Sequence, residues 1–193
     1  KKNNNNNKKN NGVTVDHILS GCEQLAKREY IERHNKIVSY LHWHICKAYD
    51  CPVSKKWYEH SPQEVTKANS RNTTILYDSQ VHTDRKIKAN KPDIVLRDNA
   101  TKKCWIIDVS IPADHNVVSK EAEKVLKYKD LAIEISRMWH TVVTVTPVVV
   151  GALGTTSKEY EKFIKEIPGN SSGVEIQRST LYGSAHILRK VLG

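Results

Sequence analysis

Two aspartates mark the ends of the strands of one predicted β-hairpin, and their positions suggest shared chemistry. Asp93 opens the apolar run 93–96, and Asp108 interrupts the apolar run 105–109, with fourteen residues between the two aspartates. A tight turn between paired strands would bring both carboxylates to one end of the sheet. Two converging carboxylates repel each other, so a close pair implies a raised pKa or a bound cation. Mg²⁺, or Mn²⁺ in its place, takes such oxygen ligands, whereas the alternative is a pair of solvated strand-end aspartates.

A lysine-bearing helix is predicted after the hairpin, over residues 119–139, which contain neither proline nor glycine. Its apolar residues form one stripe at about 100° per residue: Tyr128, Leu131, Ile135 and Met138. Traced backwards, this stripe reaches Lys124, and Lys127 lies about 60° from Lys124 around the helix. A lysine at this end of the helix could reach the carboxylates and contact a phosphate. The alternative is a lysine whose stem covers the core edge while its ammonium stays in water.

Basic residues precede the first aspartate and dominate the whole chain. The basic run consists of Arg85, Lys86, Lys88 and Lys91. The 193 residues carry a formal net charge of +10, which favours a polyanionic partner such as nucleic acid. The basic run would then contact DNA phosphates, unless it is only a solvated charged face.

The elements that must position these groups follow from hydrophobic periodicity and turn signals. Helices are predicted over residues 22–49 (one or two helices), from Ser61 to Lys67, over 119–139 with Ser119 as its cap, over 157–167, and over 175–192 with a break at Gly183. Strands are predicted over 73–77, 93–96, 104–111 and 141–154, the last cut by Pro147. This order predicts an α/β fold with a mixed central sheet flanked by helices and preceded by a helical region.

Composition predicts three segments and excludes some classes of protein. Residues 1–12 are expected to form a disordered Asn/Lys-rich tail, residues 13–70 a helical linker region, and residues 71–193 the main domain. No apolar run is long enough to cross a membrane, and the N-terminus lacks the apolar segment of a secretory signal. The four cysteines resemble no disulfide framework, which favours an intracellular setting.

An ordered series of segments resembles one family of mobile-element proteins. "KPD", the second aspartate, "KEAEKVLKYKDL", "PVVVGALG" and "GSAHILRKVL" follow one another, preceded by "DHILSGC", "RHNKIV" and "LHWHIC". Together they resemble the restriction-like endonuclease domain, a PD-(D/E)xK variant, at the C-terminus of site-specific non-LTR retrotransposon polyproteins. The resemblance covers nearly everything after the tail. It implies a restriction-endonuclease-like core that nicks target DNA, with the nick priming reverse transcription.

The resemblance also implies a role for each residue of the site. Asp93 and Asp108 would hold Mg²⁺ or Mn²⁺ with the backbone carbonyl of the residue after Asp108, and a lysine would stabilise the developing charge. The common superfamily pattern has that lysine where this chain has Ser110. In the retrotransposon variant the following helix supplies it, so Lys124 and Lys127 are both candidates. Family members often add an acidic residue upstream, for which Glu59 and Asp84 are the candidates here.

The spacing of His17 and Cys22 resembles half of the zinc knuckle found in this family, whose first cysteine pair is missing here. The residues that could complete it are His34, His42, His44, Cys46 and Cys51. His42 and Cys46 are one helical turn apart and form a feasible pair, but buried thiols and satisfied histidines are more common than ligands, so we do not expect the chain to bind zinc. The implied partners are DNA, element RNA as a second nucleic acid, and the rest of the polyprotein in cis, all in the nucleus. The alternative is a catalytically dead, nucleic-acid-binding remnant of such a polyprotein.

Overall fold

A five-stranded mixed β-sheet forms the centre of the protein in a computed structural model that describes residues 14–68 and 72–193. The Asn/Lys-rich tail predicted over residues 1–12 lies outside the described residues. The strands lie in chain order: β1 (Val65–Ala68), β2 (Thr73–Tyr77), β3 (Ile94–Asp98), β4 (Lys103–Ser110) and β5 (Val142–Val149). The first four pair antiparallel, and β5 pairs parallel to β4. The predicted mixed α/β sheet is confirmed.

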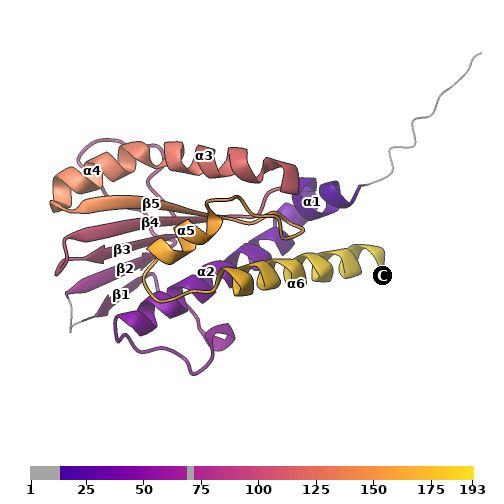
Figure 1. Cartoon of the computed structure of the whole chain (residues 1–193), viewed down its shortest axis with the longest axis horizontal. Helices are drawn as coiled ribbons and strands as arrows, with labels where there is room; N and C mark the ends of the chain where they lie inside the picture. The colour runs from indigo at the N-terminus through magenta and orange to yellow at the C-terminus, as the bar shows by residue number, and fades with distance from the viewer. Residues whose placement is uncertain (1–13, 69–71) are drawn as a thin grey trace, which may run out of the picture.

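Helices cover both faces of this sheet (Figure 1). One face carries α2 (Glu29–Ala48), α5 (Tyr160–Glu166) and α6 (Gly173–Leu192), and the other carries α3 (Val117–Lys127) and α4 (Lys129–Trp139). Shorter helical segments are η1 (His17–Gly21), α1 (Glu23–Ala26), η2 (Trp57–Glu59) and η4 (Asp114–Asn116). The chain crosses from β4 to β5 through α3 and α4, as a parallel strand pair requires.

The alternation of side chains along the central strands builds a core on each face of the sheet. Ile94 and Leu96 pack with α2, α5 and α6, whereas Val95 packs with Leu131 and Ile135 of α4. Residues of α2 share a core with strands β2 to β5, and β1 also lies before residue 71. The segments 13–70 and 71–193 therefore share one core in this structure.

The helix predicted from Ser61 to Lys67 is wrong. Val65 to Ala68 form strand β1 instead, which pairs with β2 from Val65 opposite Leu76 to Ala68 opposite Thr73. Local capping signals favoured a helix, but the segment contains β-branched residues and lies beside the open edge of β2. The backbone hydrogen bonds to β2 outweigh the local preference.

The helix predicted over 119–139 is in fact two helices that meet at Tyr128, whose φ of −99° and ψ of 5° interrupt regular helix. Ser119 does not cap it, because the first helix begins at Val117 and the Ser119 hydroxyl donates to the Asn116 carbonyl at 2.9 Å.

Pro147 does not cut its strand either. It lies within β5, an edge strand, where a missing N–H need not be paired.

Gly183 does not break α6, which runs without interruption to Leu192. A Cβ at this position would lie 2.6 Å from Cγ of Arg33, so glycine allows α2 and α6 to approach closely. The buried Arg33 guanidinium then donates to Ser184 Oγ and to the Leu19 carbonyl, both at 2.8 Å. Arg33 thus joins α2 to α6 and η1.

A second close approach, at Gly169, supports a prediction about stability. Gly169 has φ +115°, and a Cβ there would lie 2.5 Å from the backbone oxygen of His44 in α2. We expect Gly169→Ala to lower the free energy of unfolding by about 3 kcal/mol, through both backbone strain and the clash. Gly154→Ala, at φ +91° with only a 3.4 Å contact to the Leu181 side chain, should cost about 1–2 kcal/mol. Urea denaturation of both variants measures the difference, and equal losses would show that the contact with α2 is irrelevant.

Within the described residues, no helix combines the length and the apolar character needed to cross a bilayer.

Candidate active site

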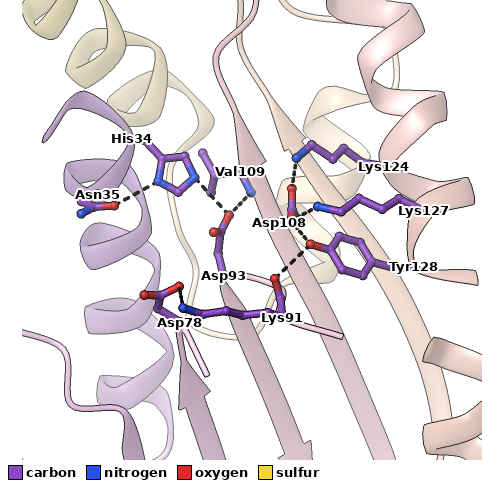
Figure 2. A network of polar contacts seen from close by, with 10 residues as sticks. All are labelled: His34, Asn35, Asp78, Lys91, Asp93, Asp108, Val109, Lys124, Lys127 and Tyr128. Carbon is purple, nitrogen blue, oxygen red and sulfur yellow. Dashed lines mark hydrogen bonds and ion pairs between the residues drawn. The ribbon is translucent and has the colours of Figure 1, made fainter. Parts of the chain in front are cut away.

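Asp108 lies near the C-terminal end of β4 and is almost completely buried, with its side chain 5% exposed. Its carboxylate faces the α3–α4 side of the sheet (Figure 2). Lys124 of α3 places Nζ 2.5 Å from Asp108 Oδ2, and Lys127 places Nζ 3.7 Å from Asp108 Oδ1. Both lysines predicted from the helix therefore reach this carboxylate, and Lys124, only 15% exposed against 39% for Lys127, is the closer and more enclosed.

Tyr128 completes the surroundings of Asp108. Its side chain is fully buried, and its hydroxyl donates to Asp108 Oδ1 and also lies 3.3 Å from the Lys91 carbonyl. Burial, and then the hydrogen bond to the Asp108 carboxylate, raise the pKa of Tyr128 well above its usual value. The phenol therefore remains a proton donor at neutral pH and fixes the orientation of Asp108. The break between α3 and α4 falls at this residue.

Asp93 immediately precedes β3, at the same end of the hairpin as Asp108, because Ile94 pairs with Ile107. Its Oδ2 accepts from the backbone N–H of Val109 at 2.6 Å and lies 3.1 Å from Nε2 of His34. Figure 2 shows Asp93 between α2 and β4, while Asp108 points towards α3. The two carboxylates thus lie at one end of the sheet, each held by its own partners.

His34 of α2 links the helix to this site. Its Nε2 faces Asp93 Oδ2, and its Nδ1 faces Asn35 Oδ1 at 3.1 Å. Each ring nitrogen therefore has an oxygen acceptor beside it. The protonated imidazolium satisfies both acceptors best, because it donates two hydrogen bonds. Burial alone would lower the pKa of His34, but the hydrogen bond and the negative charge of Asp93 outweigh it and raise this pKa.

The raised pKa of His34 predicts a pH-dependent contribution to stability. A folded-state pKa above the unfolded value of about 6.5 means that the stabilisation is fully present below that value and is lost as pH rises through the folded pKa. We expect the loss of unfolding free energy in His34→Gln to be larger at about pH 5.5 than at about pH 9, because the imidazolium is present only at the lower pH. Urea denaturation at each pH measures it, with the exposed His82→Gln as control. A loss that is independent of pH would contradict the His34–Asp93 ion pair.

The basic run lies on the irregular segment between β2 and β3, and all of its members are exposed: Arg85, Lys86, Lys88 and Lys91. Lys91 lies beside the site, since its carbonyl is near Tyr128 and its Nζ pairs with Asp78 Oδ1 at 2.9 Å. The basic run therefore ends two residues before Asp93.

The two upstream acidic candidates have partners elsewhere. Asp84 pairs with Arg137 of α4, with Nη2 2.6 Å from Asp84 Oδ2. Glu59 lies in η2 and pairs with Lys56 at 3.8 Å. The residue of a preceding helix that does reach Asp93 is a histidine, His34.

The half-knuckle is held by a hydroxyl rather than by further ligands. Tyr30 accepts a hydrogen bond from the Cys22 backbone N–H at 3.1 Å and donates to the Ile18 carbonyl at 2.7 Å, with the His17 carbonyl 3.2 Å away. Within residues 14–68 and 72–193, neither His17 nor Cys22 belongs to a group of three possible metal ligands.

The donor set at Asp93 and Asp108 fits a hard divalent cation. Both residues offer carboxylate oxygens, which Mg²⁺ prefers. Asp108 Oδ2 is buried, and its close polar neighbour in the described part of the chain is the Lys124 ammonium, 2.5 Å away. The contacts of Asp93 with His34 and with the Val109 N–H both use Oδ2. A cation at this end of the sheet would therefore compete with Lys124 for Asp108 Oδ2.

Two contributors to the site were not predicted as such from the sequence. The sequence places Tyr128 only in the apolar stripe, and it offers His34 only as a potential zinc ligand. The sequence did contain a signal for His34. The buried residues Val38, Leu41 and Ile45 of α2 recur at helical spacing, and the same spacing extended towards the N-terminus reaches His34. No family model matches the chain, and no curated protein matches it.

Proposed function

We propose that this protein is a Mg²⁺-dependent DNA endonuclease with a restriction-like core, which nicks target DNA for the integration of a non-LTR retrotransposon. The observation that carries the proposal is the convergence of a buried aspartate, a second aspartate and an enclosed lysine at one end of the β3–β4 hairpin. The order of these residues along the chain resembles that of the retrotransposon nucleases. The proposed fold family agrees with the mixed sheet but is not required by it.

Asp93 and Asp108 would hold the cation, with the Val109 carbonyl as a further oxygen ligand. When bound, Mg²⁺ or Mn²⁺ would lower the pKa of a coordinated water and polarise the scissile phosphate. The chain's own residues prepare this arrangement. His34 and the Val109 N–H orient Asp93, and Tyr128 orients Asp108, so both carboxylates are held in place before a cation binds.

Lys124 is the better candidate for the catalytic lysine. Its ammonium is enclosed and lies against Asp108, at the edge where a phosphate would approach. With Asp108 engaged as a metal ligand, Lys124 would be free to stabilise the charge that develops on the phosphoryl oxygens. Lys127, more exposed and more distant, would contact the DNA backbone or support Lys124.

DNA is the proposed substrate, and the exposed basic run would bind its phosphates beside the site. The further proposed partners are element RNA and the remainder of the polyprotein in cis, and the proposed location is the nucleus. All three rest on the family resemblance.

A nicking assay on supercoiled plasmid tests the proposal. The protein with Mg²⁺ should convert supercoiled plasmid to the open-circular form, EDTA should abolish this, and Asp108→Ala should be inactive. Equal activity of the protein and Asp108→Ala would trace the nicking to a contaminant. No nicking by either, together with salt-dependent DNA binding, would instead favour the catalytically dead remnant.

A further inference from the structure

A second group of potential ligands lies away from the two aspartates, between α2 and the segment that follows it. His42 and Cys46 occupy successive turns of α2, and His60 directly follows η2. One ligand atom from each of the three residues lies within 4.8 Å of the others. His42 and Cys46 are each 1% exposed, and His60 is half-buried. The group is therefore compact and largely shielded from solvent.

Two of the three separations lie close to those of ligands around one tetrahedral ion. Bond lengths of about 2.0–2.1 Å to nitrogen and 2.3 Å to sulfur place tetrahedral ligands about 3.3 Å apart for two nitrogens and about 3.6 Å apart for nitrogen and sulfur. His42 Nδ1 lies 3.5 Å from Cys46 Sγ and 2.8 Å from His60 Nε2. Binding would therefore require the two imidazoles to separate by about half an ångström, and Cys46 Sγ and the His60 ligand atom, which lie within 4.8 Å of each other, to settle at about 3.6 Å.

The charge states of the two imidazoles favour a metal, whereas the thiol must first lose its proton. Burial, and then the proximity of His60, lower the pKa of His42 to about 4, and burial lowers the pKa of His60. Both imidazoles are thus neutral near pH 7 and offer lone pairs. Burial, and then Cys51, raise the pKa of the Cys46 thiol to about 12, so the thiol would release one proton to the solvent as its sulfur binds the metal.

A fourth position is available on the open side of the group. The hollow beside these residues is lined by polar groups that include Ser54, Glu59 and Gln63. Water could supply the last ligand from this hollow, which the Glu59 carboxylate also lines. A set of two histidines, one cysteine and an oxygen is typical of zinc and does not suit Mg²⁺.

We propose that His42, Cys46 and His60 bind one Zn²⁺ ion, which fastens the segment 51–64 to α2. This site is distinct from the half-knuckle at His17 and Cys22 and is independent of the proposed nuclease activity. Apart from the short η2, the segment 51–64 has no regular secondary structure, and it leads into β1. The ion would therefore help to hold the segment that leads into β1, a strand at the edge of the sheet.

Cobalt substitution of the full chain tests the site without reference to catalysis. The metal-free protein titrated with Co²⁺ should bind one equivalent, with visible d–d bands and a near-ultraviolet thiolate-to-cobalt band. Cys46→Ala should lose the thiolate band, and His60→Ala should weaken Co²⁺ binding by at least about 100-fold. His60 is only half-buried, so His60→Ala remains informative if Cys46→Ala does not fold.

Matched cysteine variants provide the controls. Cys104→Ala removes another buried thiol, and Cys22→Ala removes the thiol of the half-knuckle, so both should keep the Cys46 band. Loss of the band in Cys22→Ala but not in Cys46→Ala would overturn the proposal. Absence of any Co²⁺ spectrum in the unsubstituted protein, or unchanged binding in His60→Ala, would overturn it as well.

Discussion

Asp108→Asn is expected to reduce the rate of plasmid nicking by at least about 10³-fold, which corresponds to about 4 kcal/mol of transition-state stabilisation. The amide has the shape of the carboxylate but no negative charge. It therefore holds a divalent cation poorly and leaves the enclosed Lys124 ammonium without its ionic partner. Single-turnover nicking at saturating Mg²⁺ and saturating DNA measures the effect.

Asp130→Asn is the matched control for this substitution. Asp130 is exposed in the first turn of α4, and its replacement should leave the nicking rate within about twofold. Thermal unfolding of both variants separates an effect on the chemical step from an effect on the fold. A folded Asp108→Asn protein that nicks as fast as the original would rule out Asp108 as part of the catalytic site.

The second large effect is expected at Lys124. Lys124→Met keeps most of the length of the side chain and removes the charge that lies 2.5 Å from Asp108, so nicking should slow by about 10²–10³-fold. Lys127→Met removes a charge 3.7 Å away that also stacks over the Tyr128 ring, and nicking should slow by about tenfold or less. Single-turnover rates at saturating DNA compare the two variants directly.

DNA affinity measured across a salt series distinguishes catalysis from binding in these lysine variants. If either lysine binds a DNA phosphate, its replacement weakens DNA binding and reduces the salt slope by about one, without a specific effect on the chemical step. If Lys127→Met nicks DNA more slowly than Lys124→Met, Lys127 rather than Lys124 is the catalytic lysine.

The hairpin that carries the aspartates was predictable because its signals are local. The apolar runs end at polar turn residues, and strands β3 and β4 form almost where those runs lie. The lysines were predictable for a related reason, since the core-facing stripe of one helix extends backwards to Lys124. The short interruption at Tyr128 does not disturb this stripe enough to turn Lys124 away from Asp108.

Other features depend on contacts between distant segments, which local sequence signals do not encode. Strand β1 forms only because β2 offers it an edge. The hydrogen bond from Tyr128 to Asp108 joins residues 20 positions apart, and the contact of His34 with Asp93 spans 59 residues. The choice between Lys124 and Lys127 likewise depends on their distances from Asp108, which only the fold determines.

The contacts of Arg33 that join α2 to α6 affect the order in which the chain folds. The hydrogen bond from Arg33 to Ser184 joins residues 151 positions apart, and the ion pair of Glu29 with Lys190 joins the same two helices. Such long-range closure is slow, because the entropy of a large loop is lost before the contact stabilises anything. Until α6 docks, the face of α2 that carries Arg33 remains uncovered, so we expect this face to be among the last parts of the core to be buried.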